Sequence, residues 1–458
     1  MSGSGSEASV DVTAVTRGRV RNYLSEMGPT WVAGAIAAGP ATMASLITAG
    51  ATFGYALLWI VLLSAVLGAL AQYLAMRLGV LTEAGIVTVV ENHLGDGWAW
   101  ILVVDTVLAA GLAQLVIMKG VADISAEVTG LDARIWGVAW AVILAAGLAG
   151  RGYRFIELVA KVLVSLVVIS FLASLTVVPV DPGGAAAGLV PRIPAGVDGA
   201  LVAAGILGGA VHITLVTMQS YTMRAREWTR RDYGLATFDI GASMLVAFGI
   251  YSLAIFLVAA GVLHSPDVEA GSLTAVGAAN ALGPLVGANA KWLFLLGLWG
   301  AAVSTLGGNT IVPPYLVADK LGWGTDVSDG RYRALLAATA LLSAAGAFLG
   351  GAFFPLLVLV LAFGLVGTPF ALAVVLYLLN HPRAVDTPNS MLANVGGVVL
   401  IAIAAVTAGS FVRRRVADGL GDPMTVFVLA FAVVLSVATL VLVIRFLGEV
   451  RSRRATRE

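Results

Sequence analysis

Apolar stretches of about 20 residues follow one another along almost the whole chain, and each is long enough to cross a bilayer as a helix. The chain is 59% hydrophobic and 12% charged, with a mean hydropathy of +0.96, whereas an ordinary soluble domain contains about 25% charged residues. We therefore expect an all-helical, multi-pass membrane protein with no sizeable soluble domain. The absence of cysteine excludes disulfides, thiolate metal sites and redox switching.

About twelve membrane spans are predicted from these stretches. Twelve spans place both termini on one side, and Lys and Arg are concentrated in the tails and loops of that side, so the N-terminus is expected in the cytoplasm. We therefore predict a multi-pass protein of the cell (inner) membrane. The approximate ranges are 30–50, 55–78, 98–126, 134–150, 155–179, 200–222, 236–263, 288–316, 334–350, 354–380, 390–410 and 424–447.

The first span contains a sequence that a continuous helix accommodates poorly. Its middle reads Gly39-Pro40-Ala41-Thr42, where proline lacks an amide donor and glycine adds backbone freedom. Irregular backbone at membrane depth survives only where protein or a water-filled cavity satisfies its polar groups, which is how secondary transporters build substrate sites. The first span is therefore predicted to be interrupted and to form half of a transport site.

The sixth span is predicted to be interrupted as well. Gly205, Gly208 and Gly209 are clustered just before His212. Glycine is also common where membrane helices pack closely, so the cluster alone is ambiguous. Because spans one and six are five apart, spans one to five and six to ten could form two inverted repeats, each beginning with an interrupted helix.

Several motifs resemble the natural resistance-associated macrophage protein (NRAMP) family of divalent-metal transporters. The resemblance covers about residues 28–385 and implies a LeuT-type fold of 5+5 inverted repeats, with alternating access to a site between spans one and six. It assigns residues 1–27 and 449–458 to cytoplasmic tails, 28–385 to the transport core and 386–448 to helices 11 and 12. The matching residues are Gly28-Pro29, Ala49-Gly50-Ala51, Phe53-Gly54-Tyr55, Leu57-Leu58-Trp59, Gln72, Arg77-Leu78-Gly79, Gly205 to Gly209, Asp239, Ser304-Thr305, Pro369 to Leu372 and Asn380.

The chain departs from the family pattern where metal ligands are expected. Gly39-Pro40-Ala41-Thr42 replaces Asp-Pro-Gly-Asn, so a carboxylate and an amide are lost. His212-Ile213-Thr214 replaces Met-Pro-His, so the thioether is lost and an imidazole stands in its place. The acidic residues of the family's proton route fall at about Gln114 and Ile117. The usual Mn²⁺ or Fe²⁺ chemistry and proton coupling are therefore both in doubt.

The remaining candidate ligands are backbone carbonyls, hydroxyls and one imidazole. Hard cations such as Mg²⁺ prefer oxygen ligands, and His212 is the one histidine of four predicted to lie mid-membrane. It could bind substrate or accept a proton, or its ring could simply be satisfied by a neighbouring carbonyl. The predicted substrate-binding residues are Gly39, Pro40, Ala41, Thr42, Gly209, His212, Thr214, Thr217 and Asn309, with Thr42, His212 and Thr214 as metal ligands.

Ionisable residues inside a membrane are costly and are therefore functional candidates. Lys119 and Asp123, like Glu157 and Lys161, are four residues apart, which favours structural pairing on one helix face. Asp105 has no such partner and is a relay candidate, with Gln114 as a second position. Asp239 is a gating candidate, although a carboxylate at a helix start is also stabilised by the helix dipole.

The function predicted from these residues is secondary transport of a divalent metal cation, with Mg²⁺ or another hard, hydrated ion favoured over Mn²⁺ or Fe²⁺ and with proton coupling doubtful. Two alternatives stay open, which are a same-fold carrier of a small organic solute or anion and a non-transporting membrane scaffold. The sequence contains no GxSxG, HExxH or GxxxxGK[ST] motif and no basic-aromatic surface, so neither an enzyme nor a nucleic-acid partner is expected. The expected partners are the substrate and the lipid bilayer, with no cofactor.

Overall fold

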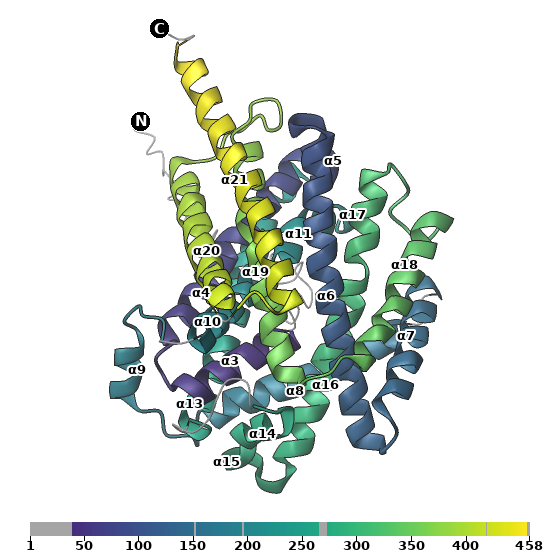
Figure 1. The fold of residues 1–458 in the computed structure, drawn as a ribbon, viewed down its shortest axis with the longest axis vertical. Helices are drawn as coiled ribbons and strands as arrows, with labels where there is room; N and C mark the ends of the chain where they lie inside the picture. Colours follow the sequence, from purple (N-terminus) through teal and green to yellow (C-terminus); the bar gives the residue numbers. More distant parts are fainter. Residues whose placement is uncertain (1–38, 151–152, 195–196, 265–272, 418, 456–458) are drawn as a thin grey trace, which may run out of the picture.

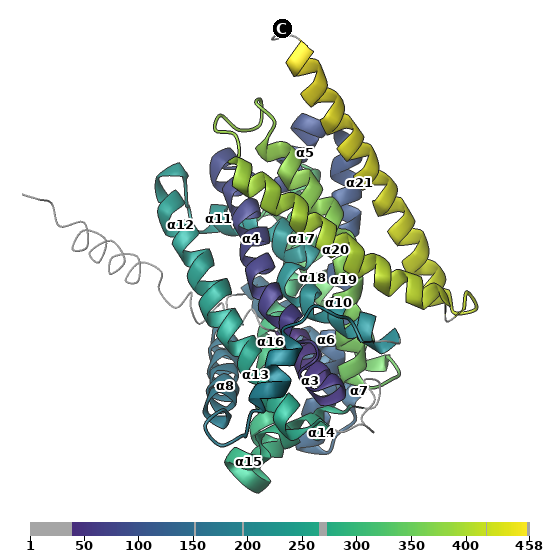
Figure 2. The same cartoon turned by 90° about the vertical axis from the view of Figure 1, so that its left-hand side faces the viewer.

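The computed structural model describes residues 39–150, 153–194, 197–264, 273–417 and 419–455. Within these ranges the chain is helical and contains no β-strand. The helices form an elongated bundle in which α19 lies near the centre, while α20 and α21 lie together on one flank (Figure 1, Figure 2). The fold is therefore the all-helical membrane architecture that the composition predicts.

The helices of the first half are α3 to α9. Residues 1–38, which include the predicted N-terminal tail and the first half of span one, lie outside the described residues. The bounds are α3 Pro40–Phe53, α4 Leu58–Thr82, α5 Ile86–Leu94, α6 Asp96–Thr129, α7 Ala133–Gly150, α8 Tyr153–Ser174 and α9 Pro182–Gly188.

The second half begins with a pair of consecutive helices and contains several short turns. The bounds are α10 Val197–Val211, α11 Ile213–Ala225, η1 Arg230–Asp232, α12 Tyr233–Ile240, a π-helical stretch at Gly241–Phe248, α13 Gly249–Val262, α14 Ala275–Ala279, η3 Asn280–Leu282, α15 Gly283–Val286, η4 Gly287–Asn289, α16 Ala290–Thr310, α17 Val312–Lys320, α18 Gly330–Leu342, η5 Ser343–Phe348, α19 Phe353–Leu379, α20 Met391–Ala417 and α21 Pro423–Ala455.

Every predicted span lies mostly on helix where the structure describes it, although turns or irregular backbone occupy some residues of the predicted ranges, such as 55–57, 175–179 and 349–350. Eight helices of the described chain are long and apolar enough to cross a membrane, and the shorter apolar stretches 133–149 and 161–174 fall on α7 and α8. α19 is the most buried of the eight, with 94% of its apolar window inside the molecule, whereas α20 and α21 have 33% and 28%. A central α19 with two peripheral C-terminal helices agrees with a ten-helix core followed by an added pair.

The interruption of span six is present, but three residues later than the glycine cluster suggested. Gly209 lies in regular helix, and the chain leaves helical geometry at His212, with φ −53° and ψ 140°. At the start of α3, Gly39 is extended (φ −62°, ψ 178°) and Pro40 is the first helical residue. Proline suits that position because the first amide of a helix has no partner within it.

Glycines join α3, α4, α10–α11 and α13 into one group, which we call the glycine-seamed group. Cβ atoms built on these glycines would lie 2.6–2.8 Å from atoms of the neighbouring helix, so the helices touch almost backbone to backbone. Gly50 of α3 meets Ala260 of α13. Gly68 of α4 meets Met244, and Gly79 of the same helix meets Ser220 of α11.

A second group contains α6, α7, η5 and α16, and we call it the scaffold group. Gly346 of η5 lies against the backbone of Leu115 in α6, so closely that a side chain would overlap it. Polar contacts add to this packing, because Ser125 of α6 accepts hydrogen bonds from the indoles of Trp140 in α7 and Trp299 in α16, at 3.1 and 3.2 Å. The site described next lies at the glycine-seamed group, near where α19 and α16 meet it.

The structure tests one of the two predicted charge pairs in the membrane. Lys119 Nζ lies 3.0 Å from Asp123 Oδ2 on α6, so the predicted structural pair is confirmed. The side chain of Glu157 lies outside the described residues, so its predicted pairing with Lys161 stays a prediction.

Candidate functional site

The start of α3 faces α10 through two matched contacts between a hydroxyl and a glycine. A Cβ on Gly209 would lie 2.7 Å from Thr42 Oγ1, and one on Gly205 would lie 2.9 Å from Ser45 Oγ. Thr42 and Gly209, predicted from the sequence to share a site, are therefore in contact. The backbone of Gly209 lies inside regular helix, so the residue contributes to this contact through its small size and not through an irregular backbone conformation.

α13 supplies further hydroxyl groups at the same level. Gly50 faces Ala259 and Ala260 while Gly54, which ends α3 at φ 54°, faces His264, so α3 and α13 run parallel in a fixed register. This register places Tyr251 and Ser252 beside the first turns of α3. Their hydroxyls and that of Ser45 are buried, and they make no hydrogen bond within the described chain.

Gly39 and Pro40 complete this end of α3 and bring it to α16. A Cβ on Gly39 would lie 2.9 Å from Thr305 Oγ1 of α16. Pro40 is buried, whereas Ala41 is half-buried. Because α3 begins here, its first amide groups lack helical partners and give this point a partial positive charge.

His212 caps α11, a role that the sequence analysis did not foresee. Its Nδ1 accepts a hydrogen bond from the backbone amide of Thr214 (3.3 Å) and lies 2.8 Å from Thr214 Oγ1. Side chains that accept from the second or third amide of a helix stabilise its first turn. An Nδ1 that accepts this bond leaves the proton of the neutral ring on Nε2.

The ring of His212 points toward α19. Nε2 faces the backbone of Val360 and Gly364, and a side chain at Gly364 would overlap the ring. It makes no hydrogen bond of ordinary geometry within the described residues. The imidazole therefore occupies the α10–α19 interface, and the α19 glycine is what makes room for it.

The carbonyl groups at the end of α10 are only partly satisfied. Interrupting the helix at His212 removes the usual amide partners of the last carbonyls of α10. Thr368 of α19 donates a hydrogen bond to the carbonyl of Val211 (2.9 Å), which satisfies one of them. The interruption therefore leaves helix-end carbonyls one turn or less from Gly209, whose built Cβ lies against Thr42, as expected for an interrupted membrane helix that lines a polar site.

Thr214 and Thr217, both predicted to bind substrate, are already engaged inside α11. Thr214 bonds His212, and Thr217 donates to the carbonyls of Ile213 (3.0 Å) and Thr214 (3.3 Å). Such bonds to the preceding turn are common for threonine in helices. The two threonines therefore lie near the interruption without pointing freely toward α3.

Asn309 lies apart from these residues, in an amide network between α16 and α6. Its amide donates to the carbonyl of Ala110 (2.7 Å) and to Oε1 of Gln114 (3.1 Å). The amide of Gln114 donates in turn to the Thr310 hydroxyl (2.5 Å). The two predicted positions, Asn309 and Gln114, are thus joined to each other by hydrogen bonds.

Asp239 forms an ion pair at the junction of α11 and α12. Arg226 donates a hydrogen bond to Asp239 Oδ2 (3.0 Å) and stacks over Trp228 at 4.7 Å. Asp239 is buried and Arg226 is about one third exposed. The gating role predicted for Asp239 stays a prediction; its position ties the interrupted helix to the start of span seven.

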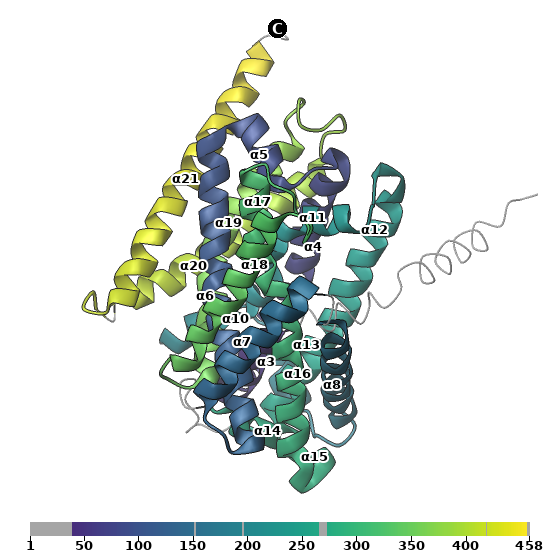
Figure 3. The same cartoon turned by 90° about the vertical axis from the view of Figure 1, so that its right-hand side faces the viewer.

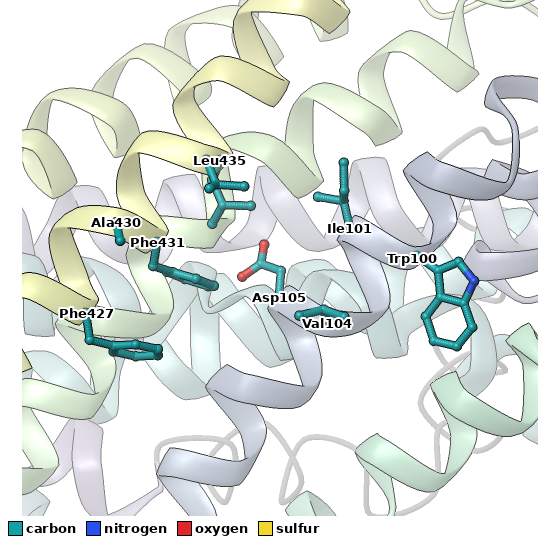
Figure 4. A pocket seen from close by; sticks show the side chains of 9 residues that line it. Trp100, Ile101, Val104, Asp105, Phe427, Ala430, Phe431 and Leu435 are labelled. Carbon is teal, nitrogen blue, oxygen red and sulfur yellow. The ribbon is translucent and has the colours of Figure 1, made fainter.

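Asp105 belongs to a different place, between α6 and α21. Its side chain is 1% exposed and makes no hydrogen bond in the described chain, and it lies against Gly367 of α19 (Figure 4). The relay role predicted for it stays a prediction. Because it lines a separate pocket, its surroundings are treated with that pocket below.

The described residues contain no group of three or more His, Cys, Asp or Glu side chains that could hold a metal ion. What gathers around the start of α3 is a set of hydroxyls, carbonyls and helix-end amides. Ser45, Tyr251 and Ser252 were missed by the sequence analysis, since nothing in their neighbourhood along the chain distinguishes them, and Thr305 was noted only as part of a motif and not as a site residue. The signal that could have identified the first three is the spacing of small residues on α3 and α13, because this spacing sets the parallel register of the two helices.

A sequence profile of the family "Natural resistance-associated macrophage protein-like" matches residues 30–413. The divalent metal cation transporter MntH of Mycobacterium tuberculosis is 27% identical over 406 residues, covering 85% of this chain and 91% of that protein. The MntH of Deinococcus radiodurans is 29% identical over 319 residues, covering 66% and 72%. These relatives are named as transporters, not as enzymes.

Solved structures agree with this assignment. A manganese transporter of Eremococcus coleocola superposes with a TM-score of 0.72 at 16% identity, covering 98% of this chain and 97% of that one. The nucleobase-cation symporter Mhp1 superposes with a TM-score of 0.50. The fold is therefore that of the LeuT-type membrane transporters. Within that class, the chain belongs to the natural resistance-associated macrophage protein family, and the resemblance read from the sequence is confirmed.

Proposed function

We propose that this protein carries a divalent metal cation across the membrane by alternating access, with Mg²⁺ or another hard, hydrated ion favoured over Mn²⁺ and Fe²⁺ and with little or no proton coupling. Family membership and relatives named as divalent metal cation transporters support the metal. The preference among metals rests on one observation, which is that hydroxyl groups, and no carboxylate or thioether, gather at the start of α3.

The donor set supports a hard ion. Thr42, Ser45, Tyr251 and Ser252 offer neutral hydroxyls, and the end of α10 offers carbonyl groups. Mg²⁺ releases its water reluctantly and is commonly bound with several waters retained. Fe²⁺ gains more from imidazole ligands, whereas Mn²⁺, like Mg²⁺, is suited by carboxylate, carbonyl and water oxygens. Here the thioether is absent, and Nδ1 of His212 is occupied as a helix cap.

The same donor set supports weak binding and weak proton coupling. No carboxylate stands at the start of α3, so a bound cation is neutralised only by dipoles, and we expect a millimolar rather than micromolar affinity. Gln114, at the position of a family acid, cannot titrate and is held by Asn309 and Thr310. A group that cannot gain or lose a proton cannot link metal movement to pH.

The division into two helix groups supports alternating access. The glycine-seamed group contains the interrupted helices, whereas α6, α7 and α16 form the scaffold group. Gly39 of the glycine-seamed group contacts the Thr305 hydroxyl of the scaffold group, and Tyr221 of the glycine-seamed group donates a hydrogen bond to Asp319 of α17, the helix that follows α16. Both contacts involve side-chain oxygens, which can exchange partners with water. Motion of one group against the other would open the start of α3 to either side.

Transport by purified protein in liposomes tests this proposal. Vesicles loaded with indicators for Mg²⁺, Mn²⁺ and pH should report Mg²⁺ entry at millimolar concentration without a matching pH change. Thr42→Ala and Ser45→Ala should slow that entry. Thr407→Ala is the matched control, because this buried threonine of α20 bonds only its own helix, to the Ile403 carbonyl. No flux of any divalent ion would overturn the proposal.

A small neutral organic solute is the second candidate, because a set of unpaired hydroxyls without a carboxylate also suits hydrogen bonding to such a molecule. Thermal unfolding of the detergent-solubilised protein with a panel of polyols, amino acids and carboxylates would reveal it. A ligand raises the apparent stability by mass action, so stabilisation by a solute together with absent metal flux would favour the second candidate.

A further inference from the structure

A pocket of about 400 Å³ lies between α6 and α21, and none of its lining residues belongs to the hydroxyl-lined site. Its walls are almost entirely apolar. Trp100, Ile101 and Val104 contribute from α6, and Phe427, Phe431 and Leu435 contribute from α21 (Figure 4). The one ionisable group among the lining residues is the carboxyl group of Asp105.

Asp105 forms the buried end of this pocket. Its side chain is 1% exposed and points between the two helices toward Phe431 (Figure 4). Neither carboxyl oxygen has a hydrogen-bond partner in the described chain, and Gly367 of α19 covers the other side of the group. An unpaired buried carboxyl is costly, so its retention calls for an occupant or a proton that removes its charge.

The aromatic side of the pocket is ordered into a stack. Phe363 of α19 stacks on Phe431 with ring centroids 4.9 Å apart and on Phe427 at 5.8 Å, with interplanar angles of 20° and 15°. Phe427 and Phe431 line the same pocket as the carboxyl group. Ring faces and a carboxylate both attract positive charge. The rings can bind a large apolar cation, but they cannot substitute for the hydration shell of a small one.

The rim of the pocket faces outward from the bundle. Val104, Phe427 and Val434 are 49%, 39% and 57% exposed, and the helices that carry them lie on the outer flank (Figure 3). In a bilayer this surface contacts lipid, so an occupant would enter from the membrane. The nearest cationic side chain on this face, Lys320, is engaged by Glu91 and Asp96 and stacks over the ring of Trp100.

We propose that the pocket between α6 and α21 binds a lipophilic organic monocation, with Asp105 as its counter-ion and Phe427 and Phe431 as its aromatic wall. One carboxylate balances one positive charge. A divalent metal would find a single charged ligand and no second ionisable group among the lining residues. This site is distinct from the proposed metal path, and neither proposal depends on the other.

Two permanently charged ions of the same shape provide the test. Tetraphenylphosphonium carries one positive charge and tetraphenylborate one negative charge on nearly identical apolar bodies. We expect saturable binding of radiolabelled tetraphenylphosphonium to the full-length protein in detergent, measured by equilibrium dialysis. Binding should weaken as the pH falls and Asp105 becomes protonated, and tetraphenylborate should not compete.

Three variants separate the roles of charge and shape. Asp105→Asn should weaken tetraphenylphosphonium binding by about tenfold or more, since it removes the counter-ion and keeps the shape. Ala430→Trp should block the pocket without touching the carboxyl group, which keeps the test valid if Asp105→Asn folds poorly. Asp123→Asn, on the same helix but paired with Lys119, is the matched control and should bind normally.

Absence of tetraphenylphosphonium binding to the unaltered protein would overturn the proposal. So would equal binding of both ions, or binding that neither Asp105→Asn nor Ala430→Trp reduces. Because the readout is binding of an organic ion, its failure is distinguishable from a failure of metal transport, which the liposome experiment measures separately.

Discussion

The contact between Thr42 and Gly209 shows how single residues determine whether α3 can approach α10. Glycine at position 209 leaves room for a hydroxyl whose oxygen would otherwise lie 2.7 Å from a Cβ. The Thr42 Cβ and Cγ2 atoms are farther from that position, at 3.4 and 3.3 Å. The steric limit at this position is therefore set mainly by one oxygen atom.

Gly209→Ala should lower the free energy of unfolding by roughly 1–3 kcal/mol, because overpacking displaces one of the helices. Adding Thr42→Ala removes the clashing oxygen, so the double variant should be more stable than the sum of the single effects, by about 1 kcal/mol. Thermal unfolding in detergent measures all three variants. Gly308→Ala is the control, since nothing lies within 4 Å of its built Cβ. Strict additivity would contradict the proposed clash.

His212 should tolerate a side chain that can cap α11. His212→Ala removes the acceptor for the Thr214 amide and should cost about 1 kcal/mol, whereas His212→Asn keeps a capping oxygen and should cost less. Unfolding measurements on both variants distinguish a capping role from a role in substrate binding. If both variants fold equally well and both abolish transport, substrate binding is the better account.

The sequence predicted that Thr42 and Gly209 share a site, and the two residues are in contact. Their role in substrate binding stays a prediction, as do those of His212 and Asn309, whose contacts with distant helices the sequence did not predict. The direction of the His212 ring is set by Gly364 of α19, and the engagement of Asn309 is set by Gln114 of α6. No pattern near His212 or Asn309 along the chain reports these partners.

At the level of elements, a carboxylate on α17 joins three segments at one end of the bundle. Asp319 accepts hydrogen bonds from the hydroxyls of Tyr221 (2.6 Å) and Thr88 (2.5 Å) and from the Thr88 amide (3.3 Å). These donors belong to α11 and α5. The contact therefore holds α11, the second half of the interrupted span, against α17, which follows α16 of the scaffold group.

Asp319→Ala should loosen this end of the bundle. Without the carboxylate the buried Tyr221 hydroxyl loses its partner, which costs about 1–3 kcal/mol in this conformation. Because the natural chain contains no cysteine, a single Ser220→Cys can be added and its rate of maleimide labelling measured with and without Asp319→Ala. We expect faster labelling in the double variant. An unchanged rate would show that the glycine contact with Gly79 alone closes this end.

The elements themselves could be predicted because apolar runs report membrane helices regardless of tertiary context. Each predicted range lies mostly on helix wherever the structure describes it. The point of interruption in span six was displaced because Gly205 and Gly209 mark close packing in this molecule, and a lone sequence does not separate packing glycines from hinge glycines.

For the whole molecule, α20 and α21 cover the core at α19 and at the Asp105 pocket. Phe363 stacks on rings of α21, and Asn380 exchanges two hydrogen bonds of 2.8 Å with Asn394 of α20. Ending the chain after residue 386 should therefore lower the thermal unfolding temperature and abolish tetraphenylphosphonium binding. Ending it after residue 448 is the control and should do neither. A stable, binding-competent short form would contradict this covering role.

The glycine seams have a mechanical consequence for the molecule. Where backbones touch at Gly50 and Gly79, interlocked helices cannot slide past one another without large steric cost. Relative movement of the helices must then take place at the few contacts made by side-chain oxygens, where water can replace a broken hydrogen bond. The helix groups should therefore move as rigid bodies about hydrated polar contacts. A substitution that blocks this motion should act most strongly at such a contact, for example between Gly39 and Thr305, rather than in the middle of a helix.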